Sequence, residues 1–582
     1  MRVFLFTVSA LQSRSLLGLL LVLWLLAIGL YPLYISPSSD DGAYISEGLG
    51  FVNFGNVSLL HIETPLPFFL ALPSYSMFEG LFLRAWMAVD LPFNYFTYNV
   101  FHQLTVVGLL FSALWLLSRA APSAQSFHLR ANIFLAALGV SPFVLDMPHL
   151  RPEPAGMALL LLGIGVAGSG LSDASGRLWR FATGGLLIGL AATFHPTFVV
   201  ASAVVGAGLL LLLILRGRVL ASAVGLIGAA VPPMLVLAWY QLHAPVSFEM
   251  LFHHVGQRSP AADAIGVSYV RIWEYATMQA GGLVGLAVKA YWAICFAVLL
   301  FSTVVGLALL LRLFSAYRHR EGDARLDLMM LCGCLLLGVC LNTLIDLSSR
   351  VQIYTVHAVA AILAMAVLLP AARADLASST VVASVPGRLV AATVALLCVL
   401  AVLFNPITHV SKQILFSTPR YDAMVASRLV RSVLQPGDAL FFTSDRHLPA
   451  FVDLVAETYA GEARFPAHWV LPFVHGSRAY EAKTVDAFVC FVARRASAPV
   501  VWGLDARYVE SVSGQPTVST IRIDTSHRLL AVDFARSETI YEFFDGVFVR
   551  GVVQSIREVR GYDGRESGAL LYPAAENAAC GS

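Results

Sequence analysis

Apolar stretches long enough to cross the roughly 30 Å hydrocarbon core of a bilayer recur along the first 408 residues of this chain. The two stretches on either side of His195-Pro196 could form one bent helix or two short ones. We therefore expect a polytopic α-helical membrane protein with ten or eleven transmembrane helices. The stretches lie at 16–35, 97–118, 131–147, 154–171, 181–197, 198–215, 219–240, 283–311, 327–347, 354–371 and 389–408.

The composition excludes an ordinary soluble protein. Of the 582 residues, 58% are hydrophobic and 13% are charged, whereas a soluble domain carries about 25% charged residues. A formal net charge of +2 provides no electrostatic footprint for nucleic acid. No small-residue cleavage site follows the first stretch, 16–35, so we interpret it as an uncleaved signal-anchor helix.

Cysteine and histidine spacing predicts no zinc or disulfide framework. Five of the seven cysteines lie in apolar runs, where a thiol behaves as a small hydrophobe, and Cys332-Gly333-Cys334 is not a metal pattern. Cys490 and Cys580 fall in the polar C-terminal region, where a disulfide is an open alternative. The adjacent His253-His254 lacks the i, i+4 spacing of a helical metal pair.

The arginines alternate between loops in a way that sets the orientation. If the N-terminus is cytoplasmic, the opposite loops hold only Arg151, Arg258, Arg271 and Arg350, and the loop 36–64 has no Lys or Arg. This positive-inside bias predicts a C-terminal domain outside the cytoplasm. The cytoplasmic side then receives Arg2, Arg14, Arg119, Arg130, Arg177, Arg180, Arg216, Arg218, Arg312, Arg318, Arg320, Arg325, Arg373 and Arg388.

Residues 410–582 are expected to form a soluble extracytoplasmic α/β domain. A helix-like stretch, 421–434, ends at Pro436-Gly437-Asp438, and a flexible tail is expected from about residue 561. No internal repeat is evident. The strand-like runs are 439–443, 469–474, 487–492, 500–504, 517–523 and 529–534.

Ionisable residues gather on the outer side of this predicted topology. Such groups at membrane depth are costly and mark functional sites by default. Their concentration on one face indicates a single outward-facing site. They are Asp40, Asp41, Glu47, His61, Glu63, Asp146, His149, Arg151, Glu153, His195, His253, His254, Lys289, Asp346 and Arg350.

Two adjacent carboxylates, Asp40 and Asp41, open the first outer loop and are followed by Tyr44. Mutual repulsion makes one of two neighbouring carboxylates the better base, which suits proton abstraction. The same residues could instead cap a following helix, where carboxylates favour the positive end of the helix dipole. The two roles are compatible.

The segment 146–154 joins two apolar stretches, and its prolines favour a tight hairpin. Arg151 in this hairpin has a planar fork suited to phosphate, and Glu153 can orient it. The alternative is a structural ion pair of Arg151 with Glu153 or Asp146 that ties the hairpin.

Three further basic residues lie at predicted outer helix ends. His195 precedes a proline and suits either packing or a contact with phosphate or sugar. Lys289 lies near the start of 283–311, where it could extend to the interface or meet a lipid phosphate. Arg350 is the basic residue of the short outer turn after 327–347, and we favour a phosphate role for it.

These features resemble the GT-C superfamily of membrane glycosyltransferases, which use polyprenyl-phosphate sugars. The resemblance is carried by Asp40-Asp41-x-x-Tyr44 after the first helix, amphipathic outer segments at about 60–95, and Arg151-Pro152-Glu153 in a hairpin. The chain looks like the branch with protein O-mannosyltransferases and the aminoarabinose transferases of lipid A. The likeness covers about residues 1–410, but the family's acidic pair is often Asp-Glu, so which carboxylate acts is open.

The resemblance implies a transmembrane catalytic domain, 1–409, with its first outer loop at 36–96, in the inner (plasma) membrane of a cell. It implies inverting transfer of a hexose or pentose from a polyprenyl phosphate or diphosphate to an acceptor hydroxyl on the outer face. The expected partners are this donor, a lipid, glycan or protein acceptor, and membrane lipids, with no nucleic acid. Mg²⁺ or Mn²⁺ is an open possibility, and no organic cofactor is expected.

The resemblance also implies roles for particular residues. Asp40, or else Asp41, is the expected catalytic base. The donor phosphate is expected to meet cationic groups, because the leaving group carries negative charge. The phosphate-binding candidates are Arg151, Arg350, Lys289 and His195, and the substrate-positioning candidates are Tyr44, Glu153, Asp146, His61 and Glu63.

Two other functions compete with the transferase. A transporter or flippase of a lipid-linked or anionic solute would explain the outer charges, but it predicts polar residues near the midplane and interrupted helices in matched pairs. A non-catalytic assembly or sensor protein would use the C-terminal domain to bind a partner. Apart from the Pro-interrupted hairpins, the midplane of the predicted helices is apolar, with Gly and Ala the main exceptions, so we favour the transferase.

Overall fold

A computed structural model of the chain describes part of its length, comprising a set of long helices and the strands of one sheet. The described residues are 11–30, 44, 74–89, 91, 95–141, 143, 151–171, 177–243, 282–317, 324–345, 353–376, 439–442, 467–469, 500–503, 528–532, 555–560 and 566–573.

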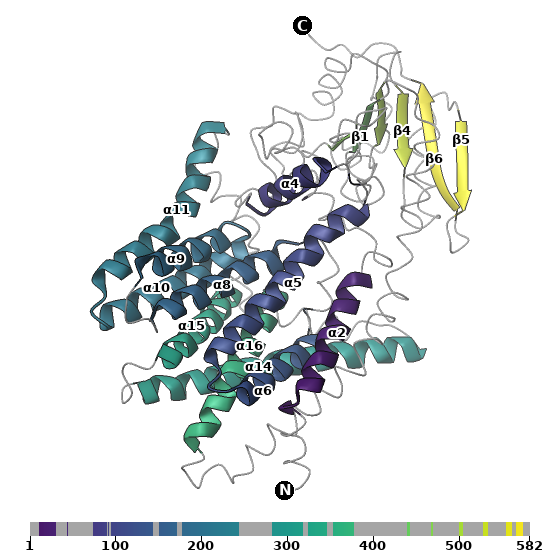
Figure 1. The fold of residues 1–582 in the computed structure, drawn as a ribbon. Coiled ribbons are helices and arrows are strands. Elements are labelled where there is room, and N and C mark those ends of the chain that lie inside the picture. Colours follow the sequence, from purple (N-terminus) through teal and green to yellow (C-terminus); the bar gives the residue numbers. More distant parts are fainter. Residues whose placement is uncertain are drawn as a thin grey trace. The chain divides into compact units, whose positions relative to one another are not determined.

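Helices coincide with the predicted apolar stretches up to residue 376 (Figure 1). Between α9 and α10 a short 3₁₀ helix, η2 (Pro196–Phe198), intervenes, so this region forms two helices and not one bent helix. The last predicted stretch, 389–408, lies outside the described residues. The helices are α2 (Arg14–Leu30), α5 (Tyr95–Ala120), α6 (Ala124–Gly139), α8 (Pro152–Leu171), α9 (Leu178–Ala192), α10 (Val199–Leu215), α11 (Val219–His243), α14 (Gly282–Tyr317), α15 (Ala324–Ile345) and α16 (Ile353–Leu376).

Several of these helices have the length and apolarity of membrane spans. Four segments of the described residues meet both criteria, namely Asn99–Ala120, Pro152–Leu171, Val219–Ala238 and Arg325–Asn342. Arg14–Leu30, Leu178–Ala192, Val199–Leu215, Ala297–Leu311 and Thr355–Leu368 are shorter apolar helices. An amphipathic outer segment was expected at about 60–95, and there the structure has α4 (Ser74–Met87), which is too short to cross a bilayer.

The chain divides into two compact units. Unit 1 comprises 1–31, 69–75 and 102–412 and contains most of the helices. Unit 2 comprises 32–68, 76–101 and 413–582, so it joins the first outer segment to the C-terminal region. The sequence analysis did not anticipate this discontinuous arrangement.

Side-chain contacts at one end of unit 1 bring together helix ends that are distant in sequence. Nη1 atoms of Arg180, Arg218 and Arg216 donate to the last carbonyls of α8, at Ser169 (2.9 Å), Gly170 (3.0 Å) and Leu171 (3.4 Å). These cations satisfy carbonyls that have no partner inside the helix and suit the negative end of its dipole. We call this end the arginine end.

Two more contacts extend the arginine end. Arg216 Nη2 lies 2.5 Å from Asp327 Oδ2 in the first turn of α15. Arg130, the seventh of the 16 residues of α6, donates through Nη1 to the carbonyl of Val367 in α16. Arg130, Arg180, Arg216 and Arg218 are all among the arginines that the sequence analysis assigned to one side of the membrane.

Glycine allows α9 and α11 to approach closely. A Cβ built on Gly185 would lie 2.1 Å from the carbonyl oxygen of Gly225, and one on Gly189 would lie 2.1 Å from that of Ala229. Small residues four positions apart permit this backbone contact between apolar helices, where lipid provides no hydrophobic drive for association. The close packing of α9 on α11 therefore depends on these glycines.

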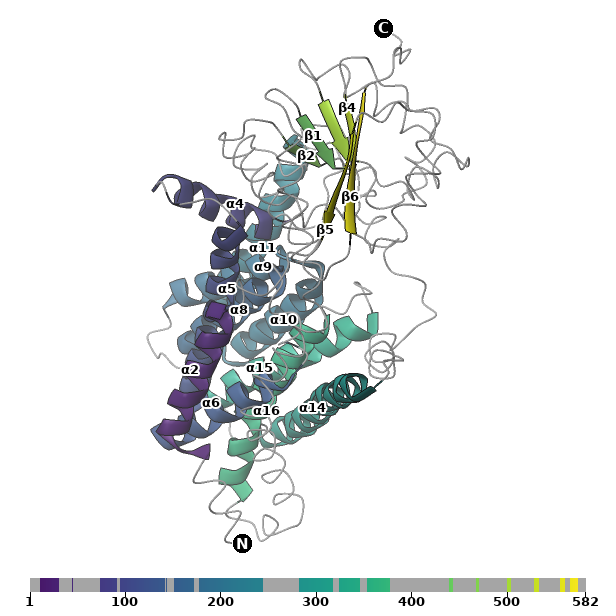
Figure 2. The ribbon, with the colours of Figure 1, turned by 90° about the vertical axis from the view of Figure 1, so that its right-hand side faces the viewer.

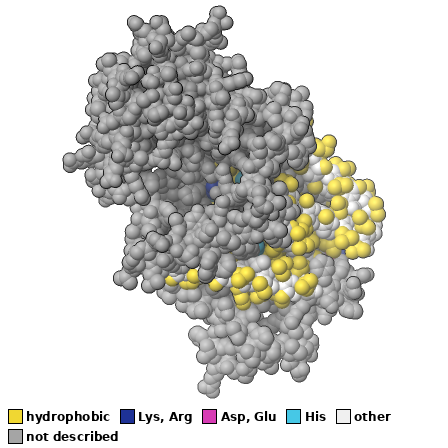
Figure 3. Space-filling model, turned by 180° about the vertical axis from the view of Figure 1, so that it is seen from behind, with side chains coloured by type: hydrophobic (Ala, Val, Ile, Leu, Met, Phe, Trp, Pro, Cys, Tyr) yellow, Lys and Arg dark blue, Asp and Glu magenta, His cyan; other side chains and the backbone are white. Residues whose placement is uncertain are grey.

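The outward faces of α10 and α11 carry exposed apolar side chains. Leu215, Val219 and Leu220 are 65–67% exposed, which is typical of residues that face lipid and not water. Figure 3 shows a face on which hydrophobic side chains dominate the described surface.

The C-terminal region contains a six-stranded mixed sheet with the order β2-β1-β3-β4-β6-β5 (Figure 2). Strands β2, β1, β3 and β4 are parallel, and β6 runs antiparallel to β4 and β5. The apolar runs Ala439–Phe442 and Val500–Gly503 are typical of buried parallel strands. The strands are β1 (Ala439–Phe442), β2 (Ala467–Trp469), β3 (Val500–Gly503), β4 (Arg528–Val532), β5 (Ser555–Arg560) and β6 (Glu566–Pro573).

The predicted strands and this sheet agree in part. Strands β1 and β3 lie within the predicted runs 439–443 and 500–504. Strand β4 begins one residue before the predicted 529–534, and β2 begins two residues before the predicted 469–474. Strand β6 lies in the stretch expected to be a flexible tail, because the apolar run Ala569-Leu570-Leu571 pairs with β4. The predicted helix 421–434 and the runs 487–492 and 517–523 lie outside the described residues.

Candidate functional site

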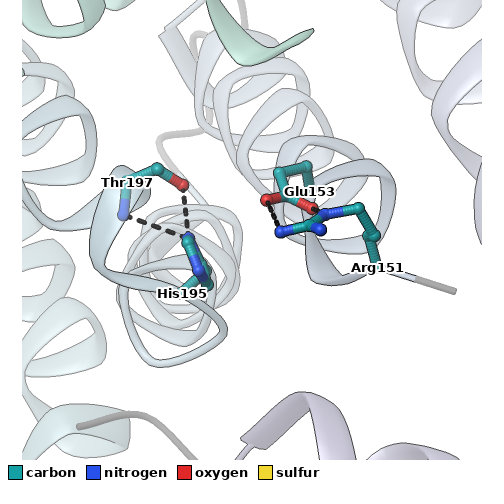
Figure 4. A network of polar contacts seen from close by, with 4 residues as sticks. All are labelled: Arg151, Glu153, His195 and Thr197. Carbon is teal, nitrogen blue, oxygen red and sulfur yellow. Dashed lines mark hydrogen bonds and ion pairs between the residues drawn. The ribbon is translucent and has the colours of Figure 1, made fainter. Parts of the chain in front are cut away.

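The end of unit 1 opposite the arginine end contains the start of α8, with Arg151 directly before it. Pro152 occupies the first helical position, where its missing N–H costs nothing, and Glu153 follows in the first turn. Arg151 Nε lies 3.2 Å from Glu153 Oε2, and Nη2 lies 3.5 Å from Oε1 (Figure 4). The Arg151 side chain is 8% exposed and that of Glu153 is 2% exposed.

This ion pair is compatible with both roles that the sequence left open for Arg151. The guanidinium engages Glu153 through two nitrogens, as expected for a structural tie and equally for a carboxylate that orients a phosphate-binding arginine. Burial makes the pair costly to break, because the remaining charge stays out of water. Asp146, the other predicted partner of Arg151, lies outside the described residues.

A turn between α9 and α10 presents His195 at the same end. The Phe198 N–H donates to the His195 carbonyl at 3.0 Å and closes η2. The Thr197 N–H donates to His195 Nδ1 at 3.4 Å, and Thr197 Oγ1 lies 3.0 Å from the same atom (Figure 4). The imidazole therefore caps the N–H group of Thr197 in the helical segment that follows it.

The first half of α8 packs directly against this turn. A Cβ built on Gly156 would lie 2.4 Å from the buried ring of Phe198, so only glycine leaves room for the ring at this position. Because Gly156 lies one helical turn beyond Glu153, the contact places the His195 turn beside the start of α8. Arg151, Glu153 and His195, three predicted site residues, therefore come from neighbouring elements of one end of unit 1.

The start of α4 joins the same junction. Ser74 Oγ donates to Thr193 Oγ1 at 2.8 Å, and Thr193 Oγ1 donates in turn to the Leu190 carbonyl at 2.7 Å. The ring of Tyr75 meets that of Phe194 edge to face, with centroids 6.2 Å apart. Ser74 and Tyr75, at the start of α4, thus contact the turn that carries His195.

The other predicted site residues are not assembled by the described structure. Tyr44 is buried, with 3% exposure, and belongs to unit 2. Lys289 lies in the first part of α14, and its side chain is outside the described part. Also outside the described residues are Asp40, Asp41, His61, Glu63, Asp146 and Arg350.

Sequence reasoning missed several polar residues that the structure buries. Ser74, Thr193 and Thr197 are 5% exposed or less. These three residues belong to no recognisable sequence motif. Only their position next to predicted helix ends could have indicated a functional role. Glu79 in α4 is also fully buried.

A buried polar contact also lies among α14, α15 and α16. Thr303 Oγ1 donates to the Leu299 carbonyl at 2.7 Å and lies 3.0 Å from His357 Nε2. Because the hydroxyl proton is used on Leu299, the imidazole N–H donates to Thr303. Cys340 Sγ lies 3.8 Å from the same nitrogen. No sequence motif marks a site here, because the sequences of these helices are mainly apolar.

Among the described residues, no group of three or more His, Cys, Asp or Glu side chains could hold a metal ion. The acidic pair, where a divalent cation was considered, is not part of them. Cys332, Cys334 and Cys340 carry free thiols.

The helices and their lipid-facing side chains define a multi-pass membrane protein. No known family model matches the sequence, and no curated protein matches it. Among solved structures, the chain is similar to ArnT from Cupriavidus metallidurans bound to undecaprenyl phosphate. That match has 13% identity and a TM-score of 0.53, and it covers 96% of this chain and 97% of the other.

Two matches to an oligosaccharyltransferase of Archaeoglobus fulgidus are more distant. The complex with Zn and sulfate has 11% identity and a TM-score of 0.45, covering 96% of this chain and 73% of the other. The enzyme named AglB, with an inhibitory peptide and a dolichol-phosphate, has 11% identity and a TM-score of 0.44, covering 95% and 74%. The likeness to ArnT is a likeness of fold, and it extends over nearly the whole of both chains.

Proposed function

We propose that this protein is a membrane glycosyltransferase that moves a sugar from a polyprenyl-phosphate donor to an acceptor hydroxyl on the outer face of the membrane. The observation that carries the proposal is the likeness, over nearly the whole of both chains, to ArnT, whose structure holds undecaprenyl phosphate. The Arg-Pro-Glu hairpin supports it independently, because it places a buried Arg151–Glu153 pair at the start of α8.

In the proposed reaction the acceptor hydroxyl attacks the anomeric carbon of the donor sugar. Asp40, or Asp41 in its place, takes the hydroxyl proton as the new C–O bond forms. The bond between the anomeric carbon and the phosphate oxygen breaks, and its electron pair leaves with the polyprenyl phosphate. A single displacement of this kind inverts the anomeric centre.

The leaving phosphate needs cationic or hydrogen-bonding groups where its charge develops. Arg151 and His195 lie on neighbouring elements, and the start of α8 adds the positive end of a helix dipole. We assign Arg350 and Lys289 to the same phosphate, and Tyr44, Glu153, Asp146, His61 and Glu63 to positioning of the substrates. The sugar is a hexose or pentose, and the acceptor is a lipid, a glycan or a protein.

We assign the protein to the inner (plasma) membrane, with the arginine end in the cytoplasm and the Arg151 end outside. Arginine is costly to move across a membrane, and arginines accumulate in cytoplasmic loops. The contacts of Arg180, Arg216 and Arg218 with the end of α8 support a common side for these residues. For the C-terminal region we propose an extracytoplasmic location, on the same positive-inside argument.

A transporter of a lipid-linked solute is the second candidate, favoured by the buried Thr303–His357 contact within apolar helices. Two successive experiments distinguish the transferase from the transporter. Mass spectrometry first identifies the lipids that co-purify with the detergent-extracted protein, and the protein with its bound lipid is then incubated in bilayers. The transferase predicts a bound polyprenyl-phosphate sugar that is converted to polyprenyl phosphate. Movement of an intact lipid-linked sugar between leaflets, without conversion, would establish the transporter instead.

A further inference from the structure

The hydrogen bonds of Thr197 determine which nitrogen of His195 carries the proton. The Thr197 N–H donates to His195 Nδ1 at 3.4 Å. A backbone amide can donate a hydrogen bond but cannot accept one, so Nδ1 must offer its lone pair. In a neutral imidazole the proton then resides on Nε2.

The Thr197 hydroxyl reinforces this assignment. Oγ1 lies 3.0 Å from Nδ1, and a hydroxyl alone could either donate or accept there. Because the backbone amide already requires an accepting Nδ1, the hydroxyl donates too. A proton on Nδ1 would face the amide hydrogen and remove the hydrogen bond from the Thr197 N–H, so this arrangement also disfavours the imidazolium.

The frame around the imidazole is fixed by packing. Thr197 and Phe198 have no exposed surface, and the Phe198 ring fills the space that Gly156 leaves on α8. Pro196 sets the backbone between His195 and Thr197. Figure 4 shows the Nδ1 edge of the ring turned to Thr197, on the turn beside the Arg151–Glu153 pair.

We propose that Thr197 is a positioning residue that holds His195 as a neutral Nε2–H donor for the phosphate of the lipid donor. This inference rests on the proposed function, since the phosphate is the group that His195 would meet. The donor state of His195 is built into the turn by the Thr197 amide and hydroxyl, and it exists before any substrate binds.

The tautomer can be measured by solid-state NMR of the ¹⁵N-histidine-labelled protein in lipid bilayers. The chain has 15 histidines, so subtraction of the His195→Gln spectrum assigns the His195 signals. We expect a protonated Nε2 and an unprotonated Nδ1 in the wild type and in Thr197→Ser. Thr197→Val keeps the amide but loses the hydroxyl, so we expect Nε2 to keep its proton while the Nδ1 signal shifts, because one of its two hydrogen-bond donors is lost. A wild-type proton on Nδ1, or a Thr197→Val spectrum identical to the wild type, would overturn the proposal.

Binding of polyprenyl phosphate to the same variants tests the consequence. Loss of one hydrogen bond that fixes the ring should weaken binding about tenfold in Thr197→Val, and Thr197→Ser should restore it. His195→Gln, whose amide nitrogen replaces Nε2–H, should bind more tightly than His195→Asn, whose amide replaces Nδ1. Equal binding by the two His195 variants would refute the phosphate contact. A wild type that binds no polyprenyl phosphate would refute the proposed function and leave the tautomer result standing.

Discussion

At the scale of single residues, the Arg151–Glu153 pair is compatible with a structural role and with a role in binding phosphate. The sequence suggested both, and the structure adds that the two side chains are buried and joined by two nitrogen–oxygen contacts. A buried pair of this kind is weak support for stability, because desolvation offsets much of the attraction. Its position at the start of α8, beside His195, favours a role in anion binding that substitution can separate from a role in folding.

Substitution of Arg151 by alanine should reduce both turnover and donor binding. If the guanidinium meets the leaving phosphate, we expect a loss of about 10²–10³-fold in kcat, and Arg151→Lys should restore only part of it. The variant also removes the cation next to a carboxylate that is 2% exposed, which should cost about 3 kcal/mol of stability. Donor affinity, turnover per folded molecule and thermal stability are measured on each variant. Lowered stability with unchanged affinity and turnover would leave Arg151 a purely structural residue.

At this scale the sequence indicated charged site candidates more readily than candidates with hydroxyl groups. Arg151, Glu153 and His195 were identified because ionisable side chains stand out in apolar surroundings. Ser74, Thr193 and Thr197 were not, because a hydroxyl gains a role only through the geometry of its neighbours, here the 2.8 Å contact of Ser74 with Thr193. The tautomer of His195 likewise depends on a turn that residue types alone do not define.

At the scale of helices, close packing depends on a few small residues. Gly189→Leu should destabilise the protein by at least about 1–3 kcal/mol, because its Cβ would lie 2.1 Å from a backbone oxygen of α11 that cannot rotate away. Gly206→Leu on α10 is the matched control, since a Cβ there meets nothing within 4 Å. Thermal unfolding of the two variants in detergent tests this. Equal effects of the two substitutions would contradict the proposed α9–α11 contact.

The link between α10 and α15 at the arginine end gives a second prediction at this scale. Asp327 is fully buried and Arg216 is 16% exposed, so removal of the cation should cost more than removal of the carboxylate. We expect Arg216→Ala to lower stability by about 3–5 kcal/mol and Asp327→Ala by less. A double-mutant cycle measures the coupling of the pair directly, and additive effects would mean that the two charges do not interact.

At the scale of the whole molecule, the sequence predicted helices better than the arrangement of the chain. Apolar length defines a membrane helix, so the described helices other than α4 overlap the predicted stretches. The alternation of apolar residues in short strands is a weaker signal, and β6 was missed for that reason. The joining of residues 32–68 and 76–101 with 413–582 in one unit depends on long-range contacts that local patterns do not contain.

The predicted topology places the two ends of unit 1 on opposite sides of the membrane. A reporter fused at about residue 125, at the start of α6, should be active in the cytoplasm, because the positive-inside bias assigns Arg119 and Arg130 to that side. A reporter fused after Ser582 should be active on the extracytoplasmic side. Matching signals from the two fusions would break the topology and, with it, the single outward-facing site.

The most direct test of the proposed function is conversion of a polyprenyl-phosphate sugar by purified protein in nanodiscs, with an extract of envelope lipids and glycans as acceptors. The wild type should release polyprenyl phosphate in equal amount to the sugar transferred. Asp40→Asn should bind the donor but release none, because an amide cannot take the hydroxyl proton, and Asp41→Asn should be milder. A wild type that leaves the donor intact, or an Asp40→Asn variant with wild-type turnover, would contradict the account.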